Sequence, residues 1–160
     1  MDQPPKITIL NVDDDGGVRY AVSRILKQAG FKVLEAASGE EALRLATNHP
    51  DLIILDVNLP DIDGFEVCRR IKSNPATSLI PILHLSATYL DSESRVKGLE
   101  GGADSYLTHP VEPLVLIASI RALLRIREGE AEREKLIRGT PGGPCKSENI
   151  EWVYSDLCLL

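Results

Sequence analysis

Two groups of aspartates follow short apolar stretches of the sequence, and these residues are the best suited to chemistry. Asp13 and Asp14 follow the mostly apolar segment 7–12, and Asp56 follows the uninterrupted apolar run 52–55. A run of that length, bounded by polar residues, is typical of a strand that is buried on both faces. We therefore expect both acid groups to lie where a strand leaves the core.

Carboxylates that gather at one edge of a sheet repel each other, and a bound divalent cation is the usual compensation. Oxygen ligands with room for water suit Mg²⁺. An aspartate beside such a cation can attack a phosphoryl group and become an aspartyl phosphate. Taken alone, Asp56 is more often a turn-forming residue at a strand end, which needs no chemistry. Ser86 and His109 follow two later apolar stretches and can reach the same edge.

The elements that must position these residues are predicted from hydrophobic periodicity and from turn and capping residues. We expect strands at residues 6–12, 31–36, 52–55, 81–85 and 104–107. We expect helices that begin after Asp15, Ser38 and Asp63, near Asp91, and at Pro113. The helix over residues 91–100 has only Val96 and Leu99 as apolar anchors, so we expect it to be the easiest to move.

The regular alternation of strands and helices predicts an α/β fold, a doubly wound five-stranded parallel sheet with helices on both faces. The expected strand order is 2-1-3-4-5, which places the first and third strands side by side where the winding reverses. Asp13, Asp14 and Asp56 then meet at one edge of the sheet. The last helix extends beyond what a small domain needs.

Length and composition predict one domain with an appendage. The chain has 160 residues, of which 43% are hydrophobic, and we expect the domain to occupy residues 5–127. Residues 128–139 carry charged pairs at helical spacing and are interpreted as a helical linker or a weak dimer helix. Residues 140–160 form an irregular tail, either a truncated boundary, a non-native appendage or a docking peptide.

Several function classes are disfavoured by the same composition. A net charge of -6 argues against direct nucleic-acid binding by this chain. No apolar run reaches membrane-spanning length, and no signal peptide is visible. The three cysteines, at positions 68, 145 and 158, lack metal-binding spacing. We therefore expect a reduced, cytoplasmic protein without membrane partners.

The motifs as a set resemble the receiver domain of two-component response regulators, which has the CheY-like fold. The matching segments are residues 12–14, 55–60 with 63–64, 85–87, and 102–107 leading to Pro110. The resemblance implies a phosphorylation-dependent signalling switch rather than an enzyme. A histidine kinase or phosphotransfer protein would donate the phosphoryl group to Asp56, with Mg²⁺ as the cofactor.

The resemblance also implies the metal ligands. Asp14, Asp56 and the backbone carbonyl of Asn58 would bind Mg²⁺ directly, and Asp13 would act through water. In this family, residues at the positions of Asn58 and Thr88 tune the lifetime of the phosphate.

The implied switch depends on two further residues. Ser86 would contact the phosphoryl group, and Tyr106 would turn inward when Ser86 moves. The helix over 91–100, the strand over 104–107 and the helix that begins at Pro113 would carry the output. Either this face or the extended last helix would form a homodimer. That helix resembles linkers between an N-terminal receiver and a sensor or kinase module, so we expect a fragment of a larger signalling protein, such as a hybrid histidine kinase.

One position departs from the family pattern. The family normally has lysine before the proline that follows strand 5, whereas this chain has His109. His109 either replaces the lysine as phosphoryl partner with altered kinetics, or fails to reach and leaves a phosphate-independent protein-interaction module. A phosphatase with Asp56 as nucleophile is disfavoured, because Asn58 replaces the usual companion aspartate. The resemblance further implies a cis bond between His109 and Pro110.

Overall fold

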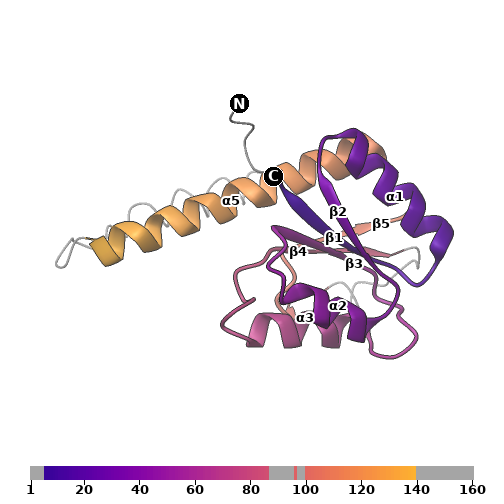
Figure 1. The fold of residues 1–160 in the computed structure, drawn as a ribbon, viewed down its shortest axis with the longest axis horizontal. Coiled ribbons are helices and arrows are strands. Elements are labelled where there is room, and N and C mark those ends of the chain that lie inside the picture. Colours follow the sequence, from indigo (N-terminus) through magenta and orange to yellow (C-terminus); the bar gives the residue numbers. More distant parts are fainter. Residues whose placement is uncertain (1–5, 87–95, 97–99, 140–160) are drawn as a thin grey trace. The chain divides into compact units, whose positions relative to one another are not determined.

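The computed structural model describes residues 6–86, 96 and 100–139. Its strands are β1 (Thr8–Val12), β2 (Lys32–Ala36), β3 (Leu52–Leu55), β4 (Ile82–Ser86) and β5 (Ser105–Thr108) (Figure 1). Its helices are α1 (Gly16–Gln28), α2 (Gly39–Ala46), α3 (Gly64–Ser73) and α5 (Pro113–Gly139). Thr88, most of the predicted helix over 91–100 and the tail 140–160 lie outside the described residues.

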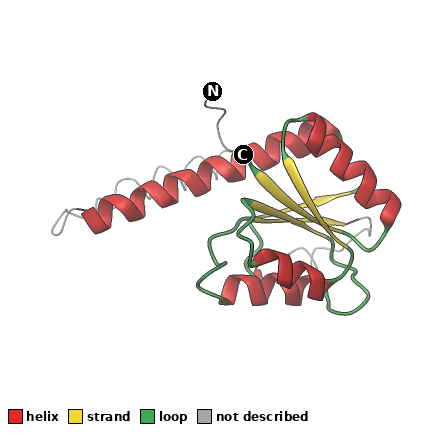
Figure 2. Ribbon diagram, viewed as in Figure 1, coloured by secondary structure: helices red, strands yellow, loops and turns green. Residues whose placement is uncertain are grey.

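The strands form one parallel sheet in the order β2-β1-β3-β4-β5, which confirms the predicted topology. The sheet is the central layer between the helices (Figure 2). Val12 at the end of β1 pairs with Leu55 at the end of β3, and Leu55 pairs with His84 in β4. Because paired parallel strands end at the same edge, the residues after Val12 and Leu55 are neighbours in space.

The helices cover both faces of the sheet, with α1 and α5 on one face and α2 and α3 on the other (Figure 1). On the α1 and α5 face, the buried core includes Ile9, Val22, Leu26, Leu52, Ile54, Leu83, Leu85, Leu116, Ile120 and Leu123. On the α2 and α3 face, it includes Leu10, Val12, Ala42, Ala46, Ile53, Leu55, Val67, Cys68 and Ile71. Burying apolar side chains on both faces accounts for the near-continuous apolar strands.

Side chains at the helix starts explain where the helices begin. Asp15 caps α1 by accepting from the N–H groups of Gly17 and Val18. Ser38 caps α2 through Glu41 N, as its sequence spacing predicts, and Asp63 caps α3. The element boundaries therefore follow local polar residues rather than the apolar pattern alone.

The predicted boundaries are correct to within two residues at the strands. β1 starts at Thr8 rather than at residue 6, and β5 is displaced by one residue from the predicted range 104–107. α5 continues through Gly129 without interruption. The bond between His109 and Pro110 is cis, as expected. The chain divides into two units at Arg127, and the second unit begins within α5.

Candidate metal and phosphoacceptor site

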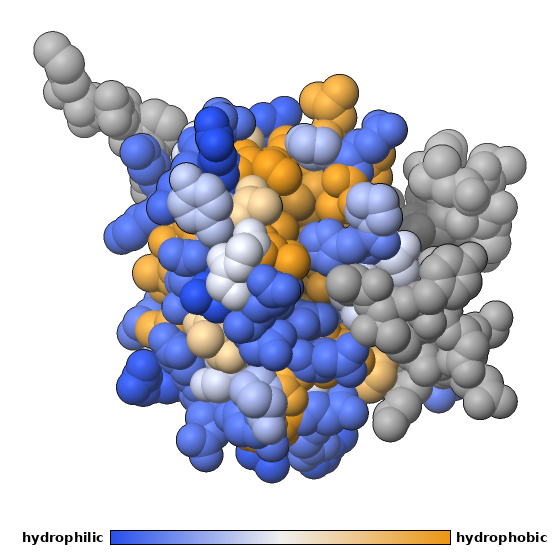
Figure 3. Space-filling view, turned by 90° about the vertical axis from the view of Figure 1, so that its right-hand side faces the viewer, coloured by the Kyte–Doolittle hydropathy of each residue, from blue (hydrophilic) through white to orange (hydrophobic). Residues whose placement is uncertain are grey.

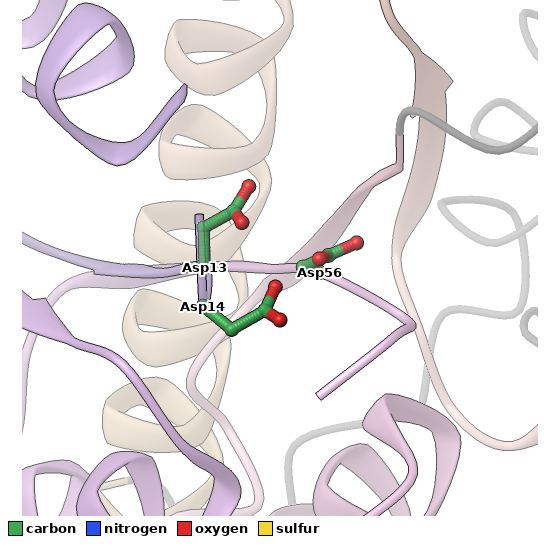
Figure 4. Close-up of side chains that lie close together, drawn as sticks. All are labelled: Asp13, Asp14 and Asp56. Carbon is green, nitrogen blue, oxygen red and sulfur yellow. The ribbon is translucent and has the colours of Figure 1, made fainter. Parts of the chain in front are cut away.

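Three aspartates meet at the carboxyl edge of the sheet, as the sequence predicts. Asp13 and Asp14 follow β1, Asp56 follows β3, and one carboxylate oxygen from each lies within 4.8 Å of the others. All three carboxylates open to the same side (Figure 4). Asp13 and Asp56 are 7% and 8% exposed, whereas Asp14 is exposed. The group therefore has two buried acids with one accessible acid beside them.

Burial and mutual repulsion make the two buried acids harder to ionise. Burial, followed by the negative charge of Asp13, raises the pKa of Asp56 to about 6. The backbone N–H groups of Asn58 and Val57 act in the opposite direction. Burial also raises the pKa of Asp13 above its usual range. Added positive charge would therefore stabilise the ionised forms of these carboxylates.

The backbone around Asp13 is held by contacts that the sequence analysis missed. Arg19 in α1 donates from Nη1 to the backbone carbonyl of Asp13 at 2.7 Å, and its Nε lies 3.5 Å from Glu35 Oε1 in β2. Asp15 N donates to Asp13 Oδ1 at 2.9 Å. The sequence shows an arginine six residues after Asp13, but helical spacing does not reveal that its side chain binds the backbone carbonyl of Asp13. Arg19 thus fixes the main chain of Asp13 from α1.

The backbone of Asp56 is fixed from two sides. Its N–H donates to the carbonyl of Val12 at 3.0 Å, which ties the end of β3 to the end of β1. Gly64 N donates to Val57 O at 2.8 Å and closes the loop after Asp56. A Cβ at Gly64 would lie 2.1 Å from the carbonyl oxygen of Asp56, so only glycine permits this approach.

Ser86 and His109 lie at the ends of the next two strands. Ser86 is fully buried at the end of β4, and the N–H of His109 donates to its carbonyl at 2.9 Å. The backbone hydrogen bond to Ser86 therefore places His109 beside the end of β4, at the carboxyl edge of the sheet. Among the described residues, the buried Nε2 of His109 has no hydrogen-bond partner.

His84 is a buried packing residue that lies close to the site. It is fully buried in β4, with its Nδ1 3.1 Å from the carbonyl oxygen of Leu55, directly before Asp56. Its ring contacts Phe65 edge-on at 5.2 Å and lies 5.9 Å from the ring of Tyr106. Burial lowers the pKa of His84. His84 therefore lies between the strand that leads to Asp56 and the predicted switch residue Tyr106.

The acid cluster is suited to Mg²⁺ by its chemistry. Its donors are carboxylate oxygens, which Mg²⁺ prefers, and the exposure of Asp14 leaves room for the water ligands that this ion retains. The raised pKa values of Asp13 and Asp56 show that additional positive charge would be stabilising there. The described residues include this one cluster of three or more potential metal-ligating acids, histidines or cysteines.

The fold and the acid cluster define a class of protein, and comparison with known families identifies the same class. The model of the response regulator receiver domain matches residues 9–121. The chain therefore belongs to the response regulator receiver domain family, whose domains are phosphoacceptors.

Individual relatives agree with this assignment. The transcriptional regulatory protein AfsQ1 of Streptomyces coelicolor is 48% identical over 125 residues, covering 78% of this chain and 54% of that protein. The response regulator MprA of Mycolicibacterium vanbaalenii is 47% identical over 154 residues, covering 96% and 60%. A CheY-like receiver domain protein from Methanospirillum hungatei has a TM-score of 0.73 at 30% identity, covering 78% and 98%.

The chain spans about half to three fifths of the length of these two curated relatives. Among the described helices, none is both long and apolar enough to cross a membrane.

Proposed function

We propose that this chain is a phosphorylation switch that accepts a phosphoryl group on Asp56 from a histidine kinase or a phosphotransfer protein. The observation that carries the proposal is the convergence of Asp13, Asp14 and Asp56 within 4.8 Å in a chain of the receiver family. Asp14, Asp56 and the backbone carbonyl of Asn58 hold Mg²⁺, and Asp13 acts through water.

The reaction is a direct transfer between two side chains. A carboxylate oxygen of Asp56 forms a bond to phosphorus while the bond from phosphorus to the donor histidine nitrogen breaks, and the electron pair leaves with the imidazole. Because the pKa of Asp56 is about 6, the carboxylate is mainly ionised at neutral pH. Bound Mg²⁺ supplies positive charge that offsets repulsion between the carboxylates and the incoming phosphoryl oxygens.

Ser86 is proposed to sense the phosphoryl group, and Tyr106 to respond. Ser86 ends β4, and its carbonyl accepts from His109 N, so a movement of Ser86 is coupled to the end of β5. Tyr106 lies on β5 opposite His84, in the strand next to Ser86. The signal then passes to the expected helix over residues 91–100, to β5 and to α5, the last two of which the structure describes.

A second function is favoured by His109, which stands where the family has lysine. A receiver that cannot contact the phosphoryl group would act as a phosphate-independent interaction module. Its acids would still bind Mg²⁺, since Asp13, Asp14 and Asp56 are intact. We favour the switch over this alternative, because the acid set that phosphorylation requires is intact.

The output we propose is the control of transcription. AfsQ1 is described as a transcriptional regulatory protein, and it extends well beyond the region that this chain matches. This relationship favours a transcriptional output over the hybrid kinase expected from the long helix. Nucleic-acid binding is then assigned to an output segment rather than to the described residues, and the cytoplasmic location stays a prediction.

A homodimer is a further part of the proposal. The face turned toward the viewer in Figure 3 is largely hydrophilic, with hydrophobic side chains gathered in its upper part. At the start of α5, Leu114 is 82% exposed and Val115 is 45% exposed. Exposed apolar residues at this position are suited to contact with a second copy of the chain.

The first experiment is to measure intact mass after incubation with acetyl phosphate and Mg²⁺. We expect the gain of one phosphoryl group, and we expect none in Asp56→Asn or in a sample treated with EDTA. A chain that binds Mg²⁺ but gains no phosphoryl group, even at short times, would exclude the small-donor switch and favour the interaction module.

The role of His109 is tested by the same assay with His109→Lys. If the imidazole serves as phosphoryl partner, the unmodified chain is phosphorylated and the lysine variant changes only the rate. If the imidazole does not reach, only the lysine variant gains the phosphoryl group.

A further inference from the structure

The loop between β3 and α3 carries Asn58, and its outer part is tied to a different element of the fold. Asp61 accepts hydrogen bonds from the first two N–H groups of α2. Gly39 N lies 2.8 Å from Asp61 Oδ1, and Glu40 N lies 2.9 Å from Asp61 Oδ2. Asp61 therefore bridges the loop that follows Asp56 to the start of α2.

The loop approaches α2 so closely that it requires glycine there. A Cβ at Gly39 would lie 2.9 Å from Val67 Cγ2, 3.0 Å from Ile62 Cβ and 3.3 Å from Asp61 Oδ1. The loop and α3 therefore pack closely against the start of α2, in addition to the polar contacts. The hydrogen bonds from Glu40 and Gly39 lower the pKa of Asp61, so its carboxylate is ionised at neutral pH.

The other end of the loop is fixed at the acid cluster itself. Gly64 N donates to Val57 O at 2.8 Å, and Gly64 packs directly on the backbone of Asp56. Between the two anchors lies Pro60, whose ring fixes its own φ and restricts the preceding residue to extended conformations. Pro60 therefore limits the conformational freedom of the segment between Asn58 and Asp61.

We propose that Asp61 is a positioning residue for the Mg²⁺ site, because it anchors on α2 the loop that presents the Asn58 carbonyl. This inference rests on the proposed function, in which that carbonyl is a ligand of the ion. Asp61 touches neither the ion nor the phosphoryl group. Its effect is to hold the carbonyl in place before the ion arrives, as outer-shell groups do in other metal sites.

A purely structural role makes a different prediction. If Asp61 only caps α2, its loss is equivalent to the loss of Ser38, whose Oγ accepts from Glu41 N at 3.2 Å at the same helix start. Ser38 has no part in the loop after Asp56. The side chains of Leu59 and Ile62 pack on the core and partly hold the loop without Asp61, so the expected effect is limited.

The experiment is a Mg²⁺ titration of the full chain followed by amide NMR, with the dissociation constant taken from signals near Asp56. In Asp61→Ala we expect Mg²⁺ affinity to fall about tenfold, at the lower end for outer-shell positions. Ser38→Ala is the control for lost helix capping. Glu40→Gln is the control for lost negative charge beside the same helix start, since Glu40 is exposed. Both controls should keep the affinity of the unmodified chain.

The outcomes separate the anchor from the proposed function. Equal affinities in Asp61→Ala and Ser38→Ala would overturn the anchor and leave the switch intact. A fall of the same size in Glu40→Gln would also overturn it, because charge alone would then explain the loss. An unmodified chain that shows no Mg²⁺-dependent shifts would overturn both. If Asp61→Ala does not fold, Asp61→Asn keeps one acceptor, and a smaller loss of affinity is expected.

Discussion

The two ends of β3 each carry an aspartate, and their surroundings are opposite. Asp51 precedes the strand and Asp56 follows it. Asp51 Oδ2 accepts from Thr8 N at 2.8 Å, and Arg127 Nη1 lies 3.7 Å from its Oδ1. Asp56 instead faces the carboxylates of Asp13 and Asp14. One residue type is thus stabilised at the amino end of a strand and repelled at the carboxyl end.

Asp51 thus has a structural role and Asp56 has the proposed functional role, although both flank the same short strand. Asp51 joins β1, β3 and α5, since Arg127 also donates to its backbone carbonyl at 2.7 Å. The side chain of Asp56 lies among other carboxylates instead, and its pKa is raised by burial and by Asp13. A protein retains such an unfavourable group where activity requires it, and the repulsion disappears when a cation binds.

The pH dependence of Mg²⁺ binding gives the largest expected effect of this asymmetry. Mg²⁺ requires the ionised carboxylate, and the pKa of Asp56 is raised from 3.8 to about 6. Affinity should therefore be constant above this pKa and fall about tenfold for each pH unit below it. Titrations at pH 7 and pH 5 by calorimetry or NMR measure the change.

Asp51→Asn provides the comparison for this pH profile. Because Asp51 lies at the opposite end of β3, its variant should keep the profile of the unmodified chain. Equal Mg²⁺ affinity of the unmodified chain at pH 7 and pH 5 would show that other groups already stabilise the ionised acids at the carboxyl end. The contrast between the two ends of β3 would then disappear.

The sequence predicts much of this contrast at the carboxyl end and none of it at the amino end. Apolar runs that stop at Asp13 and Asp56 mark strand ends, and parallel topology brings such ends together. The site edge follows from that pattern, whereas the family follows from the resemblance of the motifs at the strand ends to receiver domains. Local rules suffice because the key residues lie at the ends of recognisable elements.

Contacts between residues far apart in sequence have no such signal. The partners of Asp61 are 21 and 22 positions away, and Arg127 lies 76 positions from Asp51. The contact of His84 with Leu55 O likewise joins residues 29 positions apart. Side-chain identity shows what each residue can bind, but only the packed fold determines which partner it meets.

The stability of Asp56→Asn is the next test of the comparison. Without Mg²⁺ at pH 7, the raised pKa of Asp56 means that its ionised form destabilises the folded state. A neutral amide removes this penalty, so we expect the free energy of unfolding to rise by about 1–2 kcal/mol, less than the full two-unit shift implies because the site is partly solvated. Urea denaturation measures it.

The direction in which the free energy of unfolding changes with pH is an internal control for this prediction. A carboxyl group with a raised folded-state pKa makes the unmodified chain more stable as pH falls from 7 toward 4, and Asp56→Asn should lack that contribution. Added Mg²⁺ should stabilise the unmodified chain more than the variant. A variant less stable than the unmodified chain without Mg²⁺ would contradict the account of a repelled acid.

Removing the aspartate at the other end of β3 should change the free energy of unfolding in the opposite direction. Asp51→Ala removes the acceptor for Thr8 N and leaves that N–H without its partner. We expect the free energy of unfolding to fall by about 1 kcal/mol, with Mg²⁺ affinity unchanged. The same urea series measures it. An increase in stability would show that Asp51, like Asp56, destabilises the folded chain, and the two ends of the strand would then be alike.

Arg127→Gln tests the weakest link in the comparison, the contact between α5 and the start of β3. Arg127 Nη1 donates to Asp51 O at 2.7 Å, but its side chain is 30% exposed, so solvent reduces the value of the contact. We expect a loss of about 0.5 kcal/mol in the free energy of unfolding. Arg125→Gln is the matched control, because it removes the same charge from an exposed position on the same helix. If the two variants lose equal stability, helix propensity and net charge explain the effect. If Arg127→Gln loses more stability than Arg125→Gln, the excess belongs to the contacts of Arg127 with Asp51. Repeating Arg127→Gln in the Asp51→Ala background leaves only the bond to the backbone carbonyl of residue 51. A smaller loss there would assign the difference to the ion pair.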